Sequence, residues 1–268
     1  MNILILGDVM GSSGRKVVKQ NLKNILKEHD INFSIINGEN AADDGKGITQ
    51  EIAKEFFSLG IDVITSGNHI WDKEETTSFI ENEKRLLRPA NLVEGSPGNG
   101  YGIYNSKDKK FKIGVINLMG NVFMKKTNDV FFTAKNISKK IILKKNVDFS
   151  IIDFHGEITS EKMAMGHFFD GHSTCVVGTH THVPTADTRI LDNGTAYQTD
   201  LGMCGDYNSV IGMDKENSIK KFFKEKDAQK HFPSKGEATL SGVIVQGDKQ
   251  SGLAKKITRL LLGGSLTK

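Results

Sequence analysis

Five short apolar segments of this 268-residue chain each lead directly to side chains that can bind a metal ion. Their length and their content of Ile and Val are typical of buried parallel strands. In open α/β sheets, ligands bind just beyond the carboxyl ends of such strands. The side chains that follow the segments are therefore expected to meet at one edge of the fold. The segments are residues 3–7, 35–38, 63–67, 151–154 and 176–179.

Seven side chains at these strand ends are candidate metal ligands. Helix capping explains a single Asp or Asn, but it does not require His. Imidazole, carboxylate and amide donors without cysteine suit iron, manganese or catalytic zinc. Seven donors are too many for one tetrahedral ion, so two ions sharing a bridging carboxylate are predicted, with Glu39 as the bridge. The candidates are Asp8, Glu39, Asn40, Asn68, His155, His180 and His182.

Residues 67–69, Gly-Asn-His, carry the most specific signal for catalysis. Asn68 can offer its amide oxygen to a metal, while His69 points elsewhere and can protonate a leaving alkoxide. Gly67 would let the backbone approach the metal closely. His180 and His182 lie two residues apart, which in extended backbone places both imidazoles on one side.

The pattern of apolar residues predicts one domain over residues 1–268, an α/β (α+β) sandwich of two packed mixed β-sheets flanked by helices. The first half alternates strand and helix, and the strand-rich last third suggests the second sheet. Residues 85–100 are expected to form a loop. One helix is predicted to follow residues 10–15 and to end at about residue 29. Further helices are predicted over 49–59 with Thr49 as N-cap, after Asp72, near 132–144 and near 214–224. Further strands are predicted at 111–118, 148–154, 187–200, 237–247 and 254–262.

The composition places few limits on the partners of the protein. Its net charge of +4 comes from 36 basic and 32 acidic residues, which does not by itself indicate nucleic-acid binding. The sequence suggests no arginine-rich arm and no basic patch interleaved with aromatic residues. Cys175 and Cys204 lack a metal-binding spacing, and no signal peptide or membrane span is recognised. A cytoplasmic protein without membrane partners is expected.

The order of the metal-binding motifs resembles that of the calcineurin-like metallophosphoesterases, whose fold is a β-sandwich flanked by helices. Within this superfamily the chain is similar to the YmdB-like subfamily of bacterial 2′,3′-cyclic-nucleotide phosphodiesterases. The similarity runs in order through nearly the whole chain. It rests on residues 7–15, 37–47, 66–73, 87–91, 153–161 and 177–187.

The resemblance implies a role for each candidate residue. One metal would be held by Asp8, Glu39, Asn40 and His182, and the other by Glu39, Asn68, His155 and His180. A hydroxide bridging the two ions would attack phosphorus, and His69 would act as general acid. The chain departs from the wider superfamily at Met10, where most members have a metal-binding His, and at Glu39, where most have Asp.

The resemblance also implies the cofactors and the substrate. Two divalent or trivalent transition-metal ions are expected, iron or manganese first, with zinc or magnesium as alternatives. The implied substrate is a small-molecule cyclic nucleotide, most of all a 2′,3′-cyclic nucleotide, or an RNA end. Asp200 and residues 202–214 are left either as lining of the cleft or as a contact in a homo-oligomer, a dimer or tetramer.

Three alternatives stay open at this stage. The glycines at positions 7, 11 and 14 suggest a nucleotide-binding module without catalysis, although they match neither a dinucleotide fingerprint nor a P-loop. An RNA-associated or regulatory protein could use the metal site structurally. A phosphomonoesterase or nucleotidase could use the same ligands. Near the site, Asp72 is expected to cap a helix and Arg88 to form a surface ion pair.

Overall fold

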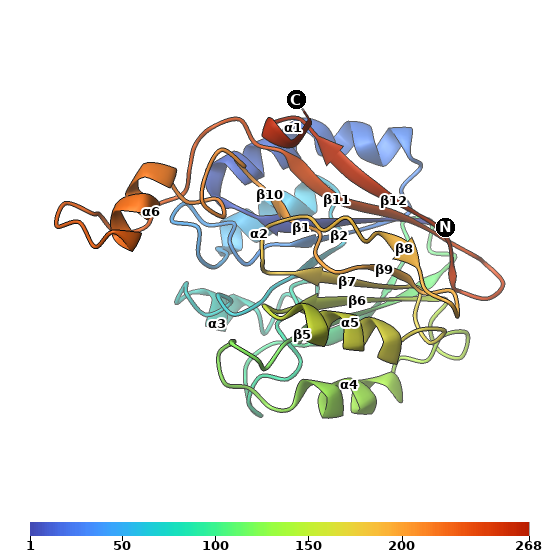
Figure 1. Ribbon diagram of the computed structural model, residues 1–268. Helices are drawn as coiled ribbons and strands as arrows, with labels where there is room; N and C mark the ends of the chain where they lie inside the picture. Colours follow the sequence, from blue (N-terminus) through green and yellow to red (C-terminus); the bar gives the residue numbers. More distant parts are fainter. Residues whose placement is uncertain (268) are drawn as a thin grey trace.

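Two six-stranded β-sheets pack face to face in the computed structural model, which describes residues 1–267 (Figure 1). The first sheet has the order β12-β11-β1-β2-β3, with β10 paired to β1. Strands β1, β2 and β3 run parallel, and β11 is antiparallel to β1. The strands are β1 (Asn2–Val9), β2 (Phe33–Asn37), β3 (Val63–Thr65), β10 (Met203–Cys204), β11 (Leu240–Gly247) and β12 (Ala254–Leu262).

The second sheet has the order β4-β5-β6-β7-β9-β8. Its four central strands, β5, β6, β7 and β9, are parallel, and β4 and β8 are antiparallel at the edges. The strands are β4 (Tyr101–Asn105), β5 (Lys112–Met119), β6 (Phe149–His155), β7 (Cys175–Thr179), β8 (Arg189–Ile190) and β9 (Ala196–Gln198).

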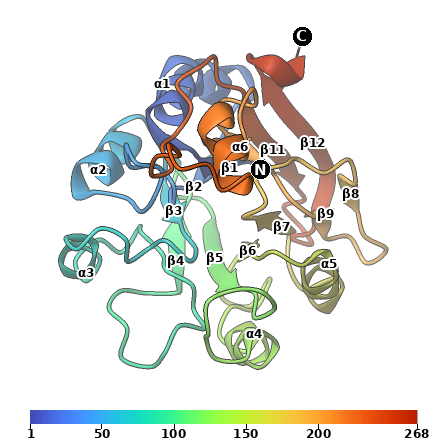
Figure 2. The same ribbon diagram turned by 60° about the vertical axis from the view of Figure 1, so that its left-hand side comes forward.

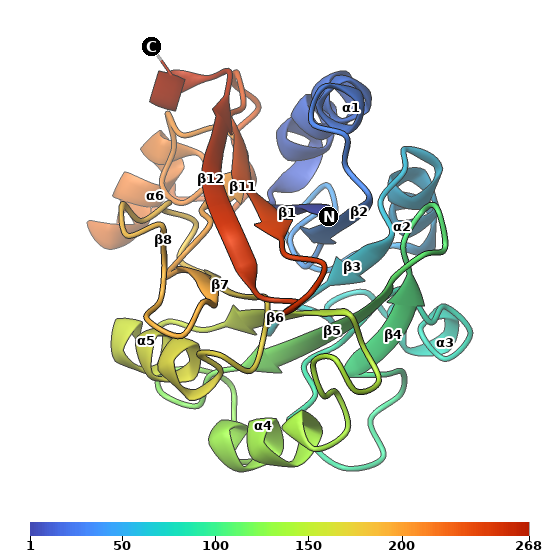
Figure 3. The ribbon, with the colours of Figure 1, turned by 90° about the vertical axis from the view of Figure 1, so that its right-hand side faces the viewer.

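Helices cover the outer face of each sheet, as the view in Figure 3, turned by 90° from Figure 1, shows. Helices α1 (Gly11–Glu28) and α2 (Gln50–Ser58) lie outside the first sheet, and α4 (Val130–Ser138) and α5 (Thr159–Phe168) lie outside the second. Helix α6 (Lys215–Phe222) instead projects from the body (Figure 1). Two short helices, α3 (Thr76–Phe79) and η1 (Ser265–Thr267), complete the described elements.

The apolar strands are buried on both faces, which explains their continuous Ile and Val runs. In β1, Ile3 and Ile5 face the second sheet and join a core with Ile151 of β6. The alternate residues Leu4 and Leu6 pack against the helices on the outside. Each sheet therefore has an inner and an outer apolar face, as the predicted sandwich requires.

The structure confirms the two packed mixed sheets but corrects how the chain forms them. The last third does not build a separate second sheet, because β10, β11 and β12 return to the first sheet while β8 and β9 join the second. Residues 187–200 are two short strands separated by a turn at Gly194, whose φ is +98°. The helix predicted near 132–144 already ends at Ser138.

Candidate metal centre

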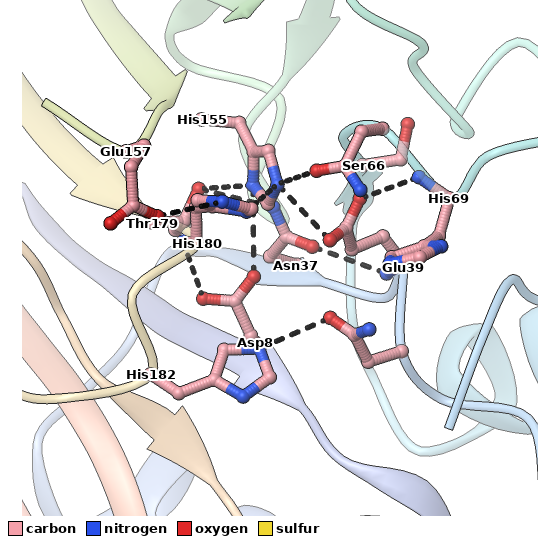
Figure 4. Close-up of polar contacts among 12 residues, drawn as sticks. Asp8, Asn37, Glu39, Ser66, His69, His155, Glu157, Thr179, His180 and His182 are labelled. Carbon is pink, nitrogen blue, oxygen red and sulfur yellow. Dashed lines mark hydrogen bonds and ion pairs between the residues drawn. The ribbon is translucent and has the colours of Figure 1, made fainter. Parts of the chain in front are cut away.

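The seven predicted ligands come together at the carboxyl ends of the parallel strands, where the two sheets meet. Figure 4 labels Asp8, Glu39, His155, His180 and His182 among them. The first sheet contributes Asp8 within β1 and the residues that follow β2 and β3. The second sheet contributes His155, the last residue of β6, and the histidines after β7. The site thus draws its donors from both halves of the sandwich.

Three of these residues have ligand atoms within 4.8 Å of one another, namely Glu39, His155 and His180. The Nε2 atom of His155 lies at the centre of this group. It is 3.0 Å from Oε1 of Glu39, 3.0 Å from Nδ1 of His180 and 3.1 Å from Oδ1 of Asn68. Glu39, Asn68, His155 and His180 therefore surround one small volume. These four residues are the predicted ligands of one of the two metal ions.

The tautomer of His155 favours metal binding through Nε2. Its Nδ1 lies 2.9 Å from Oγ1 of Thr179, and this hydroxyl donates to Oδ1 of Asp153 at 2.8 Å. Because the Thr179 hydroxyl donates its one proton to Asp153, its oxygen must accept the hydrogen bond from Nδ1–H of His155. The Nε2 atom of a neutral His155 is then an acceptor facing the other donors, an arrangement that is common for metal-bound imidazole.

A second group of donors contains His182 and Asn40. Nδ1 of His182 lies 2.8 Å from the carbonyl of Ile211, and Nδ2 of Asn40 donates to the carbonyl of Gly45. In a neutral His182 this leaves Nε2 as an acceptor, 3.2 Å from the acceptor Oδ1 of Asn40. Two acceptors at this distance repel each other, and a cation bound to both would remove the repulsion.

Asp8 lies between the two groups and is completely buried. Its Oδ2 accepts from the backbone N–H of His180 at 3.1 Å, and its Oδ1 is 3.7 Å from Nδ1 of His155. Among the described residues, Asp8 Oδ1 has no hydrogen-bond partner. A buried carboxylate oxygen without a partner is costly, and a metal ion would satisfy it.

The protonation states of the site depend mainly on the close contact between Glu39 and His155. Burial alone would raise the pKa of Glu39, but the charge and hydrogen bond of His155 lower this pKa to about 2. Burial would lower the pKa of His155, yet Glu39 and Asp8 raise it to about 9. Burial raises the pKa of Asp8 to about 6. Without a metal, a proton on His155 thus takes the place of a cation.

Gly67 is required where the backbone passes the donors. A Cβ atom at this position would lie 2.2 Å from Cδ2 of His155 and 2.4 Å from Oε2 of Glu39. No side chain fits there without displacing a ligand. The backbone at Gly67 therefore passes close to the site, as predicted. The groups that it approaches are the side chains of the candidate ligands His155 and Glu39.

His69 lies beside the donors and interacts with them through its backbone. Its N–H donates to Oε2 of Glu39 at 3.1 Å, whereas its ring Nδ1 is 2.7 Å from Oδ2 of Asp72. The ring lines a cavity of about 100 Å³ together with Glu39, His180 and His182. This placement leaves Nε2 of His69 available to a substrate.

Two neighbouring residues differ from expectation. Asp72 caps no helix, since the residue before α3 is Glu75, and its carboxylate contacts His69 and, at 3.6 Å, Lys125. Within residues 1–267 Arg88 forms no ion pair. Its guanidinium donates to the carbonyls of Pro89, Ser96 and Pro97 and so organises the loop over residues 85–100.

The segment that carries His180 and His182 is not extended, contrary to the sequence-based expectation. Both residues have left-handed backbone, with φ of +101° and +65°, a conformation that costs free energy outside glycine. Between them, the N–H of Thr181 donates to Oδ2 of Asp200 at 3.1 Å. The same oxygen accepts from Nζ of Lys162 at 2.6 Å, and both of these side chains are only 1% exposed.

Sequence inspection missed these supporting groups. Asp153 could have been recognised as a single carboxylate within the apolar strand at 151–154. Lys162 gave no such signal, because a lysine on a helix is normally exposed. Asp200 was noted as a possible part of the cleft, and the structure places it behind the histidine segment instead.

Comparison with known proteins identifies the family. A model of the YmdB-like proteins matches residues 4–260. The chain belongs to the YmdB-like family. It is 45% identical over 262 residues to a protein of Bacillus subtilis (strain 168) named 2′,3′-cyclic-nucleotide 2′-phosphodiesterase, with 98% of this chain and 97% of the relative covered. The resemblance stated from the sequence is therefore confirmed.

Solved structures agree with the fold. A crystal structure described as a novel phosphatase of Mycoplasma pneumoniae has a TM-score of 0.89 and 36% identity, covering 98% of this chain and 93% of that one. A 5′-nucleotidase from Candida albicans SC5314 has a TM-score of 0.57 at 13% identity, covering 99% of this chain and 52% of that one. The second similarity concerns the fold alone.

The family members similar to this chain carry the names of enzymes, phosphodiesterases and phosphatases, in agreement with the prediction of an enzyme. Within residues 1–267, no helix is both long and apolar enough to cross a membrane.

Proposed function

We propose that this YmdB-like protein is a dinuclear metal-dependent phosphodiesterase that hydrolyses 2′,3′-cyclic nucleotides. The observation that carries the proposal is the convergence of Glu39, His155 and His180, with the orphaned Oδ1 of Asp8 beside them. The name of the Bacillus subtilis relative supports the choice of substrate. Iron or manganese are the ions that we expect.

The residues divide between two ions. Glu39 would bridge them, with Asn68, His155 and His180 on one and Asp8, Asn40 and His182 on the other. When bound, two such ions activate water as a nucleophile at neutral pH and neutralise the phosphate oxygens. Asp153 and Thr179 orient His155, and Asp200 holds the histidine segment through Thr181.

His69 would protonate the departing oxygen. The Asp72 carboxylate, 2.7 Å from Nδ1, fixes the ring so that Nε2 is left for a substrate in the cavity that His69 lines. Opening a 2′,3′-cyclic phosphate leaves the departing oxygen on the same ribose. One proton delivered from Nε2 completes the reaction.

A phosphomonoesterase is the second candidate, since relatives from Mycoplasma carry phosphatase in their names. A monoester is a dianion, and two of the residues that would hold the ions, Asn40 and Asn68, carry no charge. The test compares kcat/KM for 2′,3′-cyclic AMP, 3′,5′-cyclic AMP and 3′-AMP under one metal condition. If 3′-AMP is preferred by tenfold or more, the protein is a phosphatase or nucleotidase.

A further inference from the structure

Helix α6 and the residues after it project from the body in Figure 1 and lie in front of it in Figure 2. The segment that leads into α6 contacts the candidate metal centre. The connection is direct. The carbonyl of Ile211 contacts His182, and Ile211 and Met213 line the same cavity as Glu39 and His69. Asp214 then caps α6 by accepting from the N–H of Asn217. A molecule that fills the cavity is therefore close to the first turn of α6.

The projection carries the whole excess of positive charge of the protein. Residues 215–235 contain seven lysines and three acidic residues. The rest of the chain has 29 basic and 29 acidic residues, so these charges balance. Lys220 pairs with Asp227. By contrast, Lys224, Lys226 and Lys230 are exposed and form no ion pair within residues 1–267.

Exposed aromatic rings lie among these lysines. Phe222 and Phe223, at the end of α6, are 81% and 76% exposed, and Ile219 one turn earlier is 49% exposed. Large apolar side chains on a projecting helix normally mark a binding surface. The sequence-based expectation of no basic patch interleaved with aromatic residues is thus wrong for residues 220–224, Lys-Lys-Phe-Phe-Lys.

We propose that residues 215–235 bind single-stranded RNA whose 3′ end, closed as a 2′,3′-cyclic phosphate, occupies the metal centre. Aromatic rings that stack bases, among lysines that follow the phosphates, are how single strands are bound without sequence preference. Helix α6 spans roughly 12 Å from its first to its last residue, a distance of a few nucleotides. The inference rests on the proposed function, because a 2′,3′-cyclic phosphate requires the 2′-hydroxyl of RNA.

The charge also argues against the main alternative occupant, a second copy of the chain. In a symmetric contact the same patch lies on both subunits. Seven lysines would then face seven lysines, and such like-charge contacts are unfavourable. A polyanion instead matches the sign of the surface.

Binding of a fluorescent oligoadenylate of roughly 12 nucleotides to the full chain tests the proposal without requiring turnover. The double variant Phe222→Ala/Phe223→Ala should weaken binding at least tenfold. Replacing Lys224, Lys226 and Lys230 by Gln should lower the slope of log affinity against log salt by about 2, given about 0.7 for each phosphate contact. Replacing the exposed Lys16, Lys23 and Lys54 by Gln is the matched control and should leave the slope unchanged.

Activity then separates this proposal from the proposed function. The α6 variants should hydrolyse 2′,3′-cyclic AMP as the wild type does, but lose at least tenfold in kcat/KM on an oligonucleotide ending in the cyclic phosphate. If wild type and α6 variants bind the oligonucleotide equally, the surface does not bind RNA. If sedimentation shows that Phe222→Ala/Phe223→Ala dissociates an oligomer without affecting RNA binding, the patch is a contact between copies.

Discussion

His69 and Asp72 are the two residues on which the proposed proton transfer depends. The three residues whose ligand atoms lie within 4.8 Å of one another do not include His69. His69 contacts Glu39 through its backbone N–H and not through its ring. The Asp72 carboxylate holds the ring from its other side. Removing the imidazole should therefore affect proton transfer and leave the ligands in place.

The variant His69→Ala is expected to keep its metal while turnover falls by about 10²–10⁴, the usual contribution of a general acid. The loss should be much smaller for nitrophenyl diesters, since nitrophenolate leaves without protonation. Elemental analysis and kcat on both substrate classes measure the two effects. Asp72→Asn is the companion variant, with a smaller loss on the same poor leaving groups. Equal losses on good and poor leaving groups would place His69 in metal binding instead.

The protonation of His155 should make metal binding dependent on pH. Its pKa of about 9 in the metal-free protein means that the ring is charged at neutral pH, while a ligand imidazole must be neutral. Metal binding should release this proton, so apparent affinity rises about tenfold per pH unit up to about pH 9. Below about pH 6 the dependence should steepen, because Asp8 also takes up a proton. Calorimetry in buffers of different ionisation enthalpy counts the protons, and binding at pH 7.5 without proton release would contradict the assignment.

At the scale of elements, the segment after β7 depends on a buried ion pair behind it. Lys162 on α5 neutralises Asp200, which accepts from the N–H groups of Thr181 and Gly202. The left-handed backbone of His180 and His182 is retained only if such contacts hold it. The Lys162–Asp200 pair therefore links the position of α5 to the geometry of the two candidate ligands His180 and His182.

Lys162→Met should destabilise the fold by about 3–5 kcal/mol, because it leaves the Asp200 charge buried and unpaired. The double variant Lys162→Met/Asp200→Asn should regain part of this stability yet bind metal more weakly, since an amide has one acceptor oxygen for two N–H groups. Denaturant unfolding and metal titration give the two readouts. Lys19→Met, which breaks the exposed Lys19–Glu55 pair, is the control and should cost under about 1 kcal/mol. A double variant that binds metal normally would show that the pair supports only stability.

Elements with a strong apolar period were predictable from the sequence, and those formed by tertiary contacts were not. Helix α2 follows its prediction, with Thr49 accepting from the N–H of Ile52 as N-cap. Helix α5 was missed because its apolar residues do not line one face. Met165 is buried, but Phe168 is partly exposed and Lys162 is buried. The two-residue strand β10 exists only through its pairing with β1.

The candidate ligands were recognisable because each stands next to an apolar strand, whereas their supporting groups were not. Asp8 and His155 are read directly from the ends of their strands. Thr179 and Asp200 act through contacts with residues far away in the chain, and nothing in their local sequence distinguishes them from other polar residues. The left-handed backbone of His180 is likewise a product of those contacts.

At the scale of the whole molecule, the candidate metal centre draws its residues from both sheets. In the first sheet, Asp8 lies within β1 and Glu39 follows β2. In the second sheet, His155 ends β6 and His180 follows β7. Without metal, the two sheets meet here through the contact of His155 with Glu39 and through Asp8. Metal ions bound at this place would hold both halves of the sandwich together.

Reconstitution with manganese or iron should therefore load close to two ions per chain and raise the melting temperature. A ligand at a thousand times its dissociation constant stabilises a fold by about 4 kcal/mol, and each kcal/mol is worth about 2–4 °C in a protein of this size. A rise of roughly 8–16 °C follows for one tightly bound ion, with a further increase for the second. Glu39→Gln should reduce both the stoichiometry and the rise, because the amide offers one oxygen where two ions share a carboxylate. A metal content that never exceeds one ion per chain, together with a Glu39→Gln variant that equals wild type, would exclude a pair of ions bridged by Glu39. In the described residues, Glu39 is the one carboxylate in the cluster with His155 and His180.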